Sequence, residues 1–186
     1  MMEVFFGIAI AVFGLWFFSR KTKEEPETPW ELHEGGITPM AQTVTLDSLY
    51  QKYGLRFGVQ PSLLKALAIV ESSENPNAKN PTDPSVGLMQ ILCVPDGKGG
   101  CKNKFNIIGW PPGKEADLYD PDYNLSLAAQ IIRWNIDTYG FNRGIAVYNS
   151  WEARLSPEWG PFPNQSYVDK VLGHYFALTG EGGTAA

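Results

Sequence analysis

Much of the information about the fold lies in residues 71–91, which read ESSENPNAKNPTDPSVGLMQI. The first of them, Glu71, follows Leu67 by four positions and Leu64 by seven, so a helix puts all three on one face. A carboxyl on that apolar face is partly desolvated, and in the last helical turn it also meets the negative end of the helix dipole. Both effects raise its pKa. We therefore predict that Glu71 donates a proton near neutral pH; the alternative is a surface carboxylate at a frayed helix end.

Helical spacing of apolar residues recurs along the chain and predicts a mainly α fold. Five segments show it: 46–53, a helix that begins at Pro61, 121–139, 143–149, and 166–178 with Ser166 as a candidate N-cap. Between residues 75 and 121 the chain is rich in Gly and Pro, and no run alternates over a useful length. We expect at most a small hairpin or an irregular lobe there.

Composition narrows the class of protein. The 186 residues are 44 % apolar and 13 % aromatic, which is enough for a packed core and excludes general disorder. The net charge of -5, without a long basic run, argues against nucleic acid as a partner. Two His and two Cys, badly spaced, predict no metal site, and nothing in the sequence calls for a cofactor.

The N-terminal segment differs from the rest. Residues 4–18 read VFFGIAIAVFGLWFF. As a helix they span about 22 Å, which is less than the roughly 30 Å of a membrane's hydrocarbon core. If the helix starts at Met1 and Arg20 and Lys21 snorkel, it becomes long enough to cross. We predict a transmembrane helix at 1–20, a flexible linker at 21–45, a globular domain at 46–178 and a flexible tail at 179–186. A cleaved signal peptide is the rival, disfavoured by Glu3 and by bulky residues at the segment's end; a buried core helix is the other alternative.

Several motifs together resemble a known family. Glu71-Ser72 is followed by Asn75-Pro76-x-Ala78 and by a Ser-x-Gly-Leu-Met-Gln run from Ser85 to Gln90. Further matches come in the same order: Leu118-Tyr119-Asp120-Pro121 with Asn124, then Val147-Tyr148-Asn149, then Tyr167-Val168 with Val171. The set resembles the lytic transglycosylases of the lysozyme superfamily, with their soluble-lytic-transglycosylase (SLT), goose-type-lysozyme-like domain, over residues 46–175.

The chain departs from that family's pattern in two places. Ser150-Trp151 stands where the family has Ala-Gly, and an insertion between Ile91 and Leu118 holds both cysteines. Cys93 and Cys101 flank a Gly-rich turn, and in a protein that faces the cell wall such a pair is expected to form a disulfide. The alternative is two free thiols in a reducing compartment.

The resemblance implies cleavage of peptidoglycan glycan strands at the β-1,4 bond between N-acetylmuramic acid and N-acetylglucosamine. Glu71 would be the catalytic residue, first as acid and then as base, and the product would carry a 1,6-anhydromuramoyl end. The implied substrate-binding residues include Ser72 and Ser85, whose hydroxyls would bond the sugar, and Gln90 and Asn149, whose planar amides would recognise acetamido groups. Tyr148 and Tyr167 would bond Glu71 or stack on a sugar. Gly87 would permit close backbone approach, and Met89 would lie in the cleft floor or the core.

Ordinary glycosidases need two carboxylates, and no second acid stands at a family position here. Glu74, Asp83 and Asp96 are expected to be solvated or to cap turns. If one of them faced Glu71, a hydrolysing muramidase would become the better interpretation. A catalytically silent, structural peptidoglycan-binding protein is the alternative from another class, and an intact Glu71 argues against it.

Positive charge after the apolar segment, at Arg20, Lys21 and Lys23, would leave the domain on the cytoplasmic side, where there is no peptidoglycan. Two explanations are open: the three acidic residues that follow override the charge bias, or the protein belongs to a bacteriophage virion and acts during entry. We therefore expect the protein in a virion membrane, or in a bacterial inner membrane with its domain facing the periplasm. Its further partners would be other virion or secretion-complex proteins.

Overall fold

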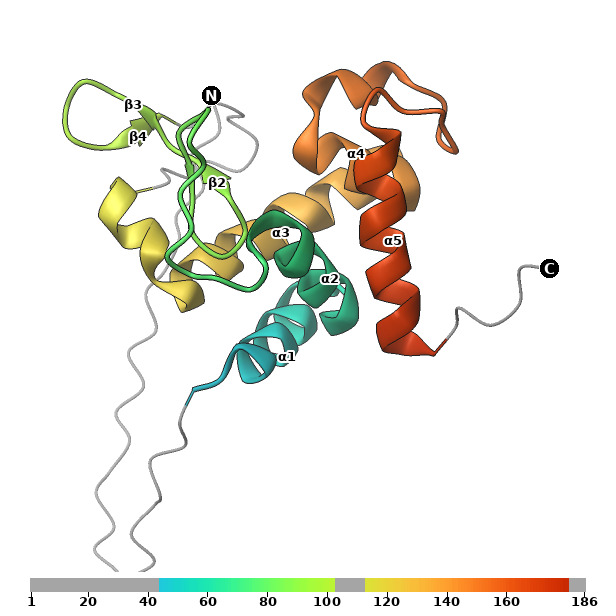
Figure 1. The fold of residues 1–186 in the computed structure, drawn as a ribbon, viewed down its shortest axis with the longest axis horizontal. Coiled ribbons are helices and arrows are strands. Elements are labelled where there is room, and N and C mark those ends of the chain that lie inside the picture. Colours follow the sequence, from blue (N-terminus) through green and yellow to red (C-terminus); the bar gives the residue numbers. More distant parts are fainter. Residues whose placement is uncertain (1–43, 103–112, 181–186) are drawn as a thin grey trace, which may run out of the picture. The chain divides into compact units, whose positions relative to one another are not determined.

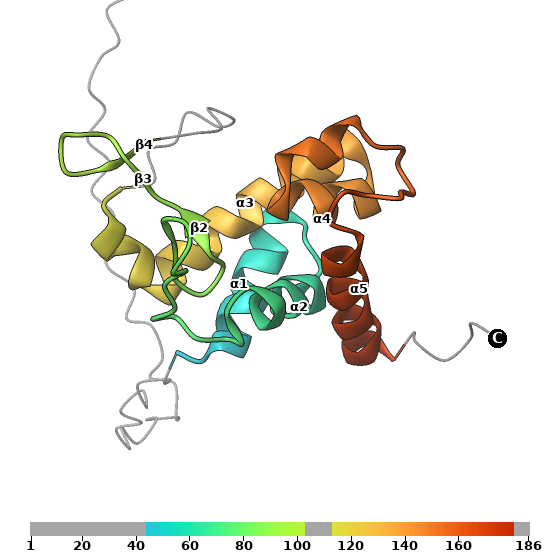
Figure 2. The same cartoon turned by 45° about the horizontal axis from the view of Figure 1, so that its top comes forward.

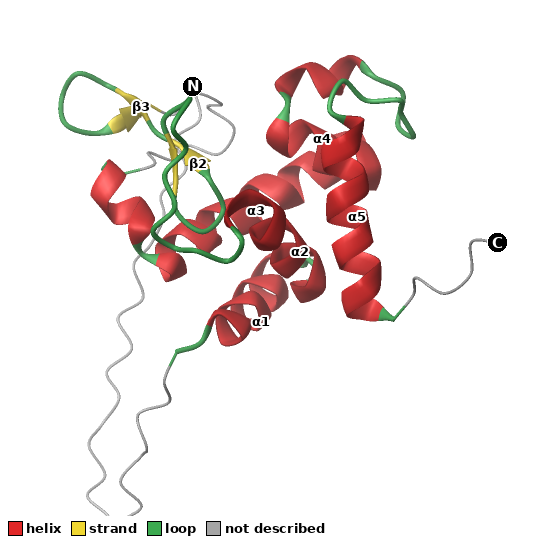
Figure 3. Cartoon of the chain, viewed as in Figure 1, coloured by secondary structure: helices red, strands yellow, loops and turns green. Residues whose placement is uncertain are grey.

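The computed structural model describes residues 44–102 and 113–180, and these two ranges form a mainly helical domain (Figures 1 and 3). The predicted mainly α class is confirmed. The helices are α1 (Leu46–Phe57), α2 (Pro61–Ser72), α3 (Pro121–Tyr139), α4 (Phe141–Asn149) and α5 (Gln165–Thr179), with 3-10 turns η1 (Glu115–Tyr119) and η2 (Trp151–Leu155).

Local sequence signals set the ends of the first two helices. Thr45 and Ser48 form a reciprocal capping box at the start of α1, and Gly58, at φ 66°, ends the helix in the left-handed conformation. Pro61 opens α2, where its fixed φ suits the first helical position, and Ser73 ends that helix at φ 56°. Glu71 therefore lies in the last turn of α2.

The core is built where α3 meets α1 and α4, and where α2 meets α1 and α5. Figures 1 and 2 show α5 standing alongside α2. Leu64 and Leu67 of α2 have no exposed surface, and neither do Leu125 and Ile132 of α3. Burying such side chains contributes about 1.5–3 kcal/mol each. The α2 face predicted to be apolar is the buried one.

Two short hairpins occupy the stretch between α2 and α3. Strand β1 (Ser85–Val86) pairs antiparallel with β2 (Ile91–Leu92), with Val86 opposite Ile91. Strand β3 (Val94–Pro95) pairs with β4 (Cys101–Lys102), and a disulfide joins Cys93 to Cys101. The predicted disulfide is confirmed, and the structure has two hairpins where the sequence indicated at most one.

Some predicted details need correction. Ser166 lies inside α5, and Asn164 precedes the helix, without a side-chain cap bond. The first and fourth helices are longer than predicted, reaching Phe57 and starting at Phe141. Within residues 44–102 and 113–180, no helix is long and apolar enough to cross a membrane; the predicted anchor at 1–20 lies outside these residues.

Candidate active site

Glu71 is desolvated and makes one strong polar contact. The hydroxyl of Tyr167, on α5, donates to Glu71 Oε1 at 2.6 Å, across 96 residues of chain. Burial raises the pKa of Glu71 from 4.5 to about 7; the hydrogen bond from Tyr167 opposes this, and the charge of Asp83 adds to it. A carboxyl with this pKa is protonated in about half of the molecules at neutral pH, as a group that must both donate and accept a proton requires.

A second tyrosine from a different helix lies near Glu71 but bonds elsewhere. The hydroxyl of Tyr148, in the last turn of α4, donates to the carbonyl of Met89 at 2.9 Å. Burial, and then the charge of Glu71, raise the pKa of Tyr148 well above its ordinary value. Of the two tyrosines expected to bond Glu71 or stack on a sugar, Tyr167 makes the bond to Glu71 and Tyr148 makes a bond to the backbone.

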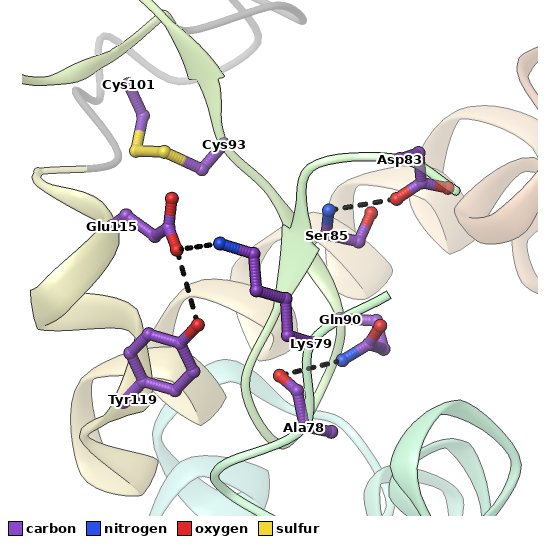
Figure 4. A network of polar contacts seen from close by, with 9 residues as sticks. All are labelled: Ala78, Lys79, Asp83, Ser85, Gln90, Cys93, Cys101, Glu115 and Tyr119. Atoms are coloured by element: carbon purple, nitrogen blue, oxygen red, sulfur yellow. Dashed lines mark hydrogen bonds and ion pairs between the residues drawn. A yellow bond between two sulfur atoms is a disulfide. The ribbon is translucent and has the colours of Figure 1, made fainter. Parts of the chain in front are cut away.

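The segment Gly87–Gln90, called here the Gly87–Gln90 strip, runs past the end of α2. The Ser72 hydroxyl donates to the carbonyl of Leu88 at 2.7 Å, which ties the strip to the residue after Glu71. Gln90 has φ 48°, and its side-chain amide donates to the carbonyl of Gly87 at 2.9 Å and, more weakly, to that of Ala78 at 3.5 Å (Figure 4). The strip is thus fixed both from α2 and by its own turn.

Gly87 is required by a close approach within the protein. Its φ is 83°, and an added Cβ would lie 2.2 Å from the carbonyl oxygen of Leu118 and 2.3 Å from Nδ2 of Asn124. The close backbone approach at this glycine is therefore to Leu118 of η1 and to Asn124 of α3.

Several residues expected to bind substrate already have protein partners. The Ser72 hydroxyl bonds backbone groups, and Ser85, in β1, is buried. Met89 has no exposed surface. It is therefore a core residue, one of the two possibilities (floor or core) given for it from the sequence. Asn149 is exposed at the end of α4, where its Oδ1 accepts from Asn164 Nδ2 at 3.0 Å. Gln90 and Asn149 also have protein partners, but Gln90 is only half-buried and Asn149 is exposed.

Asn164 is a site residue that sequence reasoning missed. Its Nδ2 also donates to the carbonyl of Ala146, while its Oδ1 is buried with no hydrogen-bond partner. The sequence signal was its position three residues before Tyr167, in the segment that follows η2. It joins the end of α4 to the start of α5, and these two helices supply both tyrosines of the site.

The charge of another acidic residue, Asp83, acts on Glu71. Its Oδ1 accepts from the backbone N–H of Ser85 at 2.9 Å (Figure 4). Its Oδ2 accepts from the side chain of Asn80 at 3.0 Å, so Asp83 caps a turn, as expected. Asp83 nevertheless stays exposed, and its negative charge raises the pKa of Glu71.

A polar network holds the loop after α2 against η1. Lys79 pairs with Glu115 at 2.6 Å, and the hydroxyl of Tyr119 donates to the same oxygen at 3.3 Å (Figure 4). The Cys93–Cys101 disulfide lies nearby, at the base of the β3–β4 hairpin, because Cys93 precedes β3 and Cys101 lies in β4. In the part of the chain that the structure describes, no group of three or more His, Cys, Asp or Glu residues could hold a metal ion.

Among the described residues, Glu71 is the carboxyl whose pKa is raised by burial, and it lies in the last turn of α2 in a mainly helical domain. The model of the transglycosylase SLT domain family matches residues 48–161, and the chain belongs to that family. The resemblance drawn from its motifs is confirmed.

Solved structures agree with this assignment. The 70-kDa soluble lytic transglycosylase of Escherichia coli is 26 % identical, with a TM-score of 0.53 over 72 % of this chain and 24 % of that one. The same kind of enzyme in complex with bulgecin A gives 26 % identity and a TM-score of 0.54 over 78 % and 25 % of the two chains. An inactive variant of the lytic transglycosylase Slt from Pseudomonas aeruginosa shares the fold at 22 % identity, with a TM-score of 0.57 over 77 % and 24 %. This chain spans about a quarter of the length of these enzymes.

Proposed function

We propose that this protein is a peptidoglycan lytic transglycosylase that uses Glu71 as its acid and base. The observation that carries the proposal is the desolvated carboxyl of Glu71 at the end of α2, with a pKa of about 7. Membership of the SLT domain family supports it, as do solved relatives that are named lytic transglycosylases.

The reaction follows from one group that changes role. Protonated Glu71 gives its proton to the glycosidic oxygen between N-acetylmuramic acid and N-acetylglucosamine as the C1–O bond breaks, and the substrate's own N-acetyl group stabilises C1. Glu71, now a carboxylate, takes the proton of the muramoyl C6 hydroxyl, whose oxygen attacks C1 and closes the 1,6-anhydro ring. The second transfer restores the protonated acid, and no water is consumed.

Tyr167 is the residue that we assign to holding Glu71 during these steps. Its hydroxyl stabilises the carboxylate formed after the first proton transfer, because a hydrogen bond from a donor favours the charged form. Gln90 and Asn149 are proposed to recognise acetamido groups, since Asn149 is exposed and Gln90, the last residue of the strip, is only half-buried.

Product analysis tests the proposal. Purified full-length protein is incubated with peptidoglycan, and the released muropeptides are reduced with borohydride and weighed by mass spectrometry. Anhydro ends are about 20 Da lighter than reduced hydrolysis products, since a glycosidase with two carboxylates adds water and leaves a reducible end. Anhydro products that vanish with Glu71→Gln support the assignment, and reducible ends as the main product overturn it.

A hydrolysing muramidase is the second candidate, and the charge of Asp83 on Glu71 is the observation that favours it. A second carboxylate near the bond is what inverting and retaining hydrolases require. In a hydrolase, Asp83→Asn should abolish release of reducible ends. In a transglycosylase it should leave anhydro release in place and only lower the pKa of Glu71, because a negative neighbour is removed.

We also propose the chain organisation predicted from sequence: a membrane anchor at 1–20, a linker at 21–45 and the enzyme domain at 46–178, with a virion-associated role in phage entry. The uninterrupted apolar run supports the anchor, and the Pro- and Gly-bearing segment after it supports the linker. The virion role is supported by the positive charge at Arg20, Lys21 and Lys23, which would leave the domain on the cytoplasmic side of a cellular membrane. The full chain should co-sediment with lipid vesicles, and deletion of residues 1–23 should release an active, soluble protein. Full-length protein that stays in the supernatant would contradict the anchor.

A further inference from the structure

Asn124 is a buried polar residue that the proposed reaction does not use directly. It lies in the first turn of α3, has no exposed surface, and its side chain reaches three backbone groups. Oδ1 accepts from the N–H of Met89 at 2.8 Å. Nδ2 donates to the carbonyls of Val86 at 3.1 Å and Leu118 at 2.8 Å. One amide thus joins β1, the Gly87–Gln90 strip and η1 to α3.

The next contact in this chain leads toward Glu71. Met89, whose N–H is held by Asn124, offers its carbonyl to the hydroxyl of Tyr148. Tyr148 is close enough to feel the charge of Glu71, yet its proton is committed to Met89, whereas that of Tyr167 is committed to Glu71. Asn124 therefore sets the position of the acceptor that keeps Tyr148 turned to the backbone.

We propose that Asn124 is a positioning residue for the site: through Met89 it fixes the Tyr148 hydroxyl beside the Glu71 carboxyl, so that Glu71 accepts a hydrogen bond from Tyr167 and none from Tyr148. This rests on the proposed role of Glu71 as acid and base. If the strip moved, Tyr148 could donate to Glu71, and a second donor would favour the carboxylate over the acid needed for the first step.

Other groups around Glu71 do not supply this control. Asp83, from the loop before β1, is the charge that acts on Glu71, and it raises the pKa. On α1, which packs on α2, Lys52 pairs with Asp122 and Asp47 with Lys65. On α5, Tyr167 already bonds Glu71.

The test compares Asn124→Leu with Asn135→Leu in the full-length protein, acting on soluble, uncross-linked peptidoglycan strands. Asn135 is another buried asparagine of α3, eleven residues further on and outside the site, so it controls for loss of a buried amide. We expect kcat to fall about 10- to 10²-fold in Asn124→Leu with KM little changed. We also expect its loss of activity on the alkaline side to move to lower pH by about one unit, the effect of one more hydrogen bond to a carboxylate.

The double variant Asn124→Leu with Tyr148→Phe isolates the cause. Without the Tyr148 hydroxyl, the alkaline limb of the activity profile, where activity is lost as pH rises, should return toward its wild-type pH. The value of kcat should nevertheless stay low. If Asn124→Leu does not fold, Asn124→Ser, which leaves room for water at the vacated partners, takes its place.

The outcomes separate the two proposals. A folded Asn124 variant whose kcat and alkaline limb match those of the Asn135 control would overturn the positioning role, and so would a shift that persists in the double variant. Failure of the proposed function shows instead in the wild-type products, because the alkaline limb reports the protonation of Glu71 whether those products are anhydro or reducible.

Discussion

Replacing Glu71 by Gln should stop wall lysis and, at the same time, stabilise the protein at alkaline pH. The amide keeps the shape of the carboxyl, and its oxygen can still accept from the Tyr167 hydroxyl, but it delivers no proton. Loss of a general acid and base lowers the rate by at least about 10²- to 10⁴-fold. The gain in stability arises because the wild-type protein must bury a charge that the variant lacks.

The size of that gain follows from the pKa of Glu71. Its ordinary pKa is 4.5 and its folded pKa is about 7, so the folded protein retains a proton that the unfolded chain has lost. At pH 4 both states are protonated, and wild type and variant should be equally stable. Between pH 4.5 and 7 the wild type loses stability progressively, and above pH 7 the loss is complete, at about 3 kcal/mol at most.

The measurement is the free energy of unfolding by denaturant at pH 4, 6 and 8 for both proteins. Other titrating groups cancel in the difference, which should rise from near zero to about 3 kcal/mol in favour of Glu71→Gln. Glu115→Gln is the matched control with the opposite sign: the hydrogen bond from Lys79 lowers the pKa of Glu115, so this variant should be the less stable one at neutral pH and should match wild type in acid. A difference for Glu71→Gln that does not change with pH, or wall lysis by the folded variant, would refute the reasoning.

Three further outcomes are expected. Tyr167→Phe removes the bond that lowers the pKa of Glu71, so the alkaline limb of the kcat profile should move up by about one to two pH units. An unmoved limb would show that the hydroxyl is not bonded there in solution. Gly87→Ala should destabilise the protein strongly, because the added Cβ meets atoms at 2.2 and 2.3 Å. Gly97→Ala, at φ 77° with nothing within 4 Å of the added Cβ, should cost only the backbone strain of about 1–2 kcal/mol. Equal losses of stability in denaturant unfolding would contradict the packing at Gly87. Replacing Cys93 and Cys101 together by Ser should lower the free energy of unfolding by about 2–3 kcal/mol. The variant should stay folded and melt a few degrees below the wild type. Free thiols titrated in the oxidised wild type would contradict the disulfide.

Local patterns were sufficient for the helices and for the nature of Glu71. The spacing of Leu64, Leu67 and Glu71 is a property of one helix, so it reports burial of that face without knowledge of what covers it. The raised pKa follows mainly from that burial, which is why it was predictable. Helix ends were less exact, as for α5, because the residues that begin a helix depend on the loop that enters it.

The partners of Glu71 were settled only by packing between distant segments. Tyr167 stands 96 residues away and reaches Glu71 because α5 packs on α2; the same sequence in another packing would leave both groups exposed. Asn124 was named only as one residue of a motif, and its three bonds exist because α3, η1, β1 and the Gly87–Gln90 strip meet there. Periodicity reports which side of a helix is buried, but the pairing of polar groups across that buried side depends on the relative placement of helices, to which no local pattern refers.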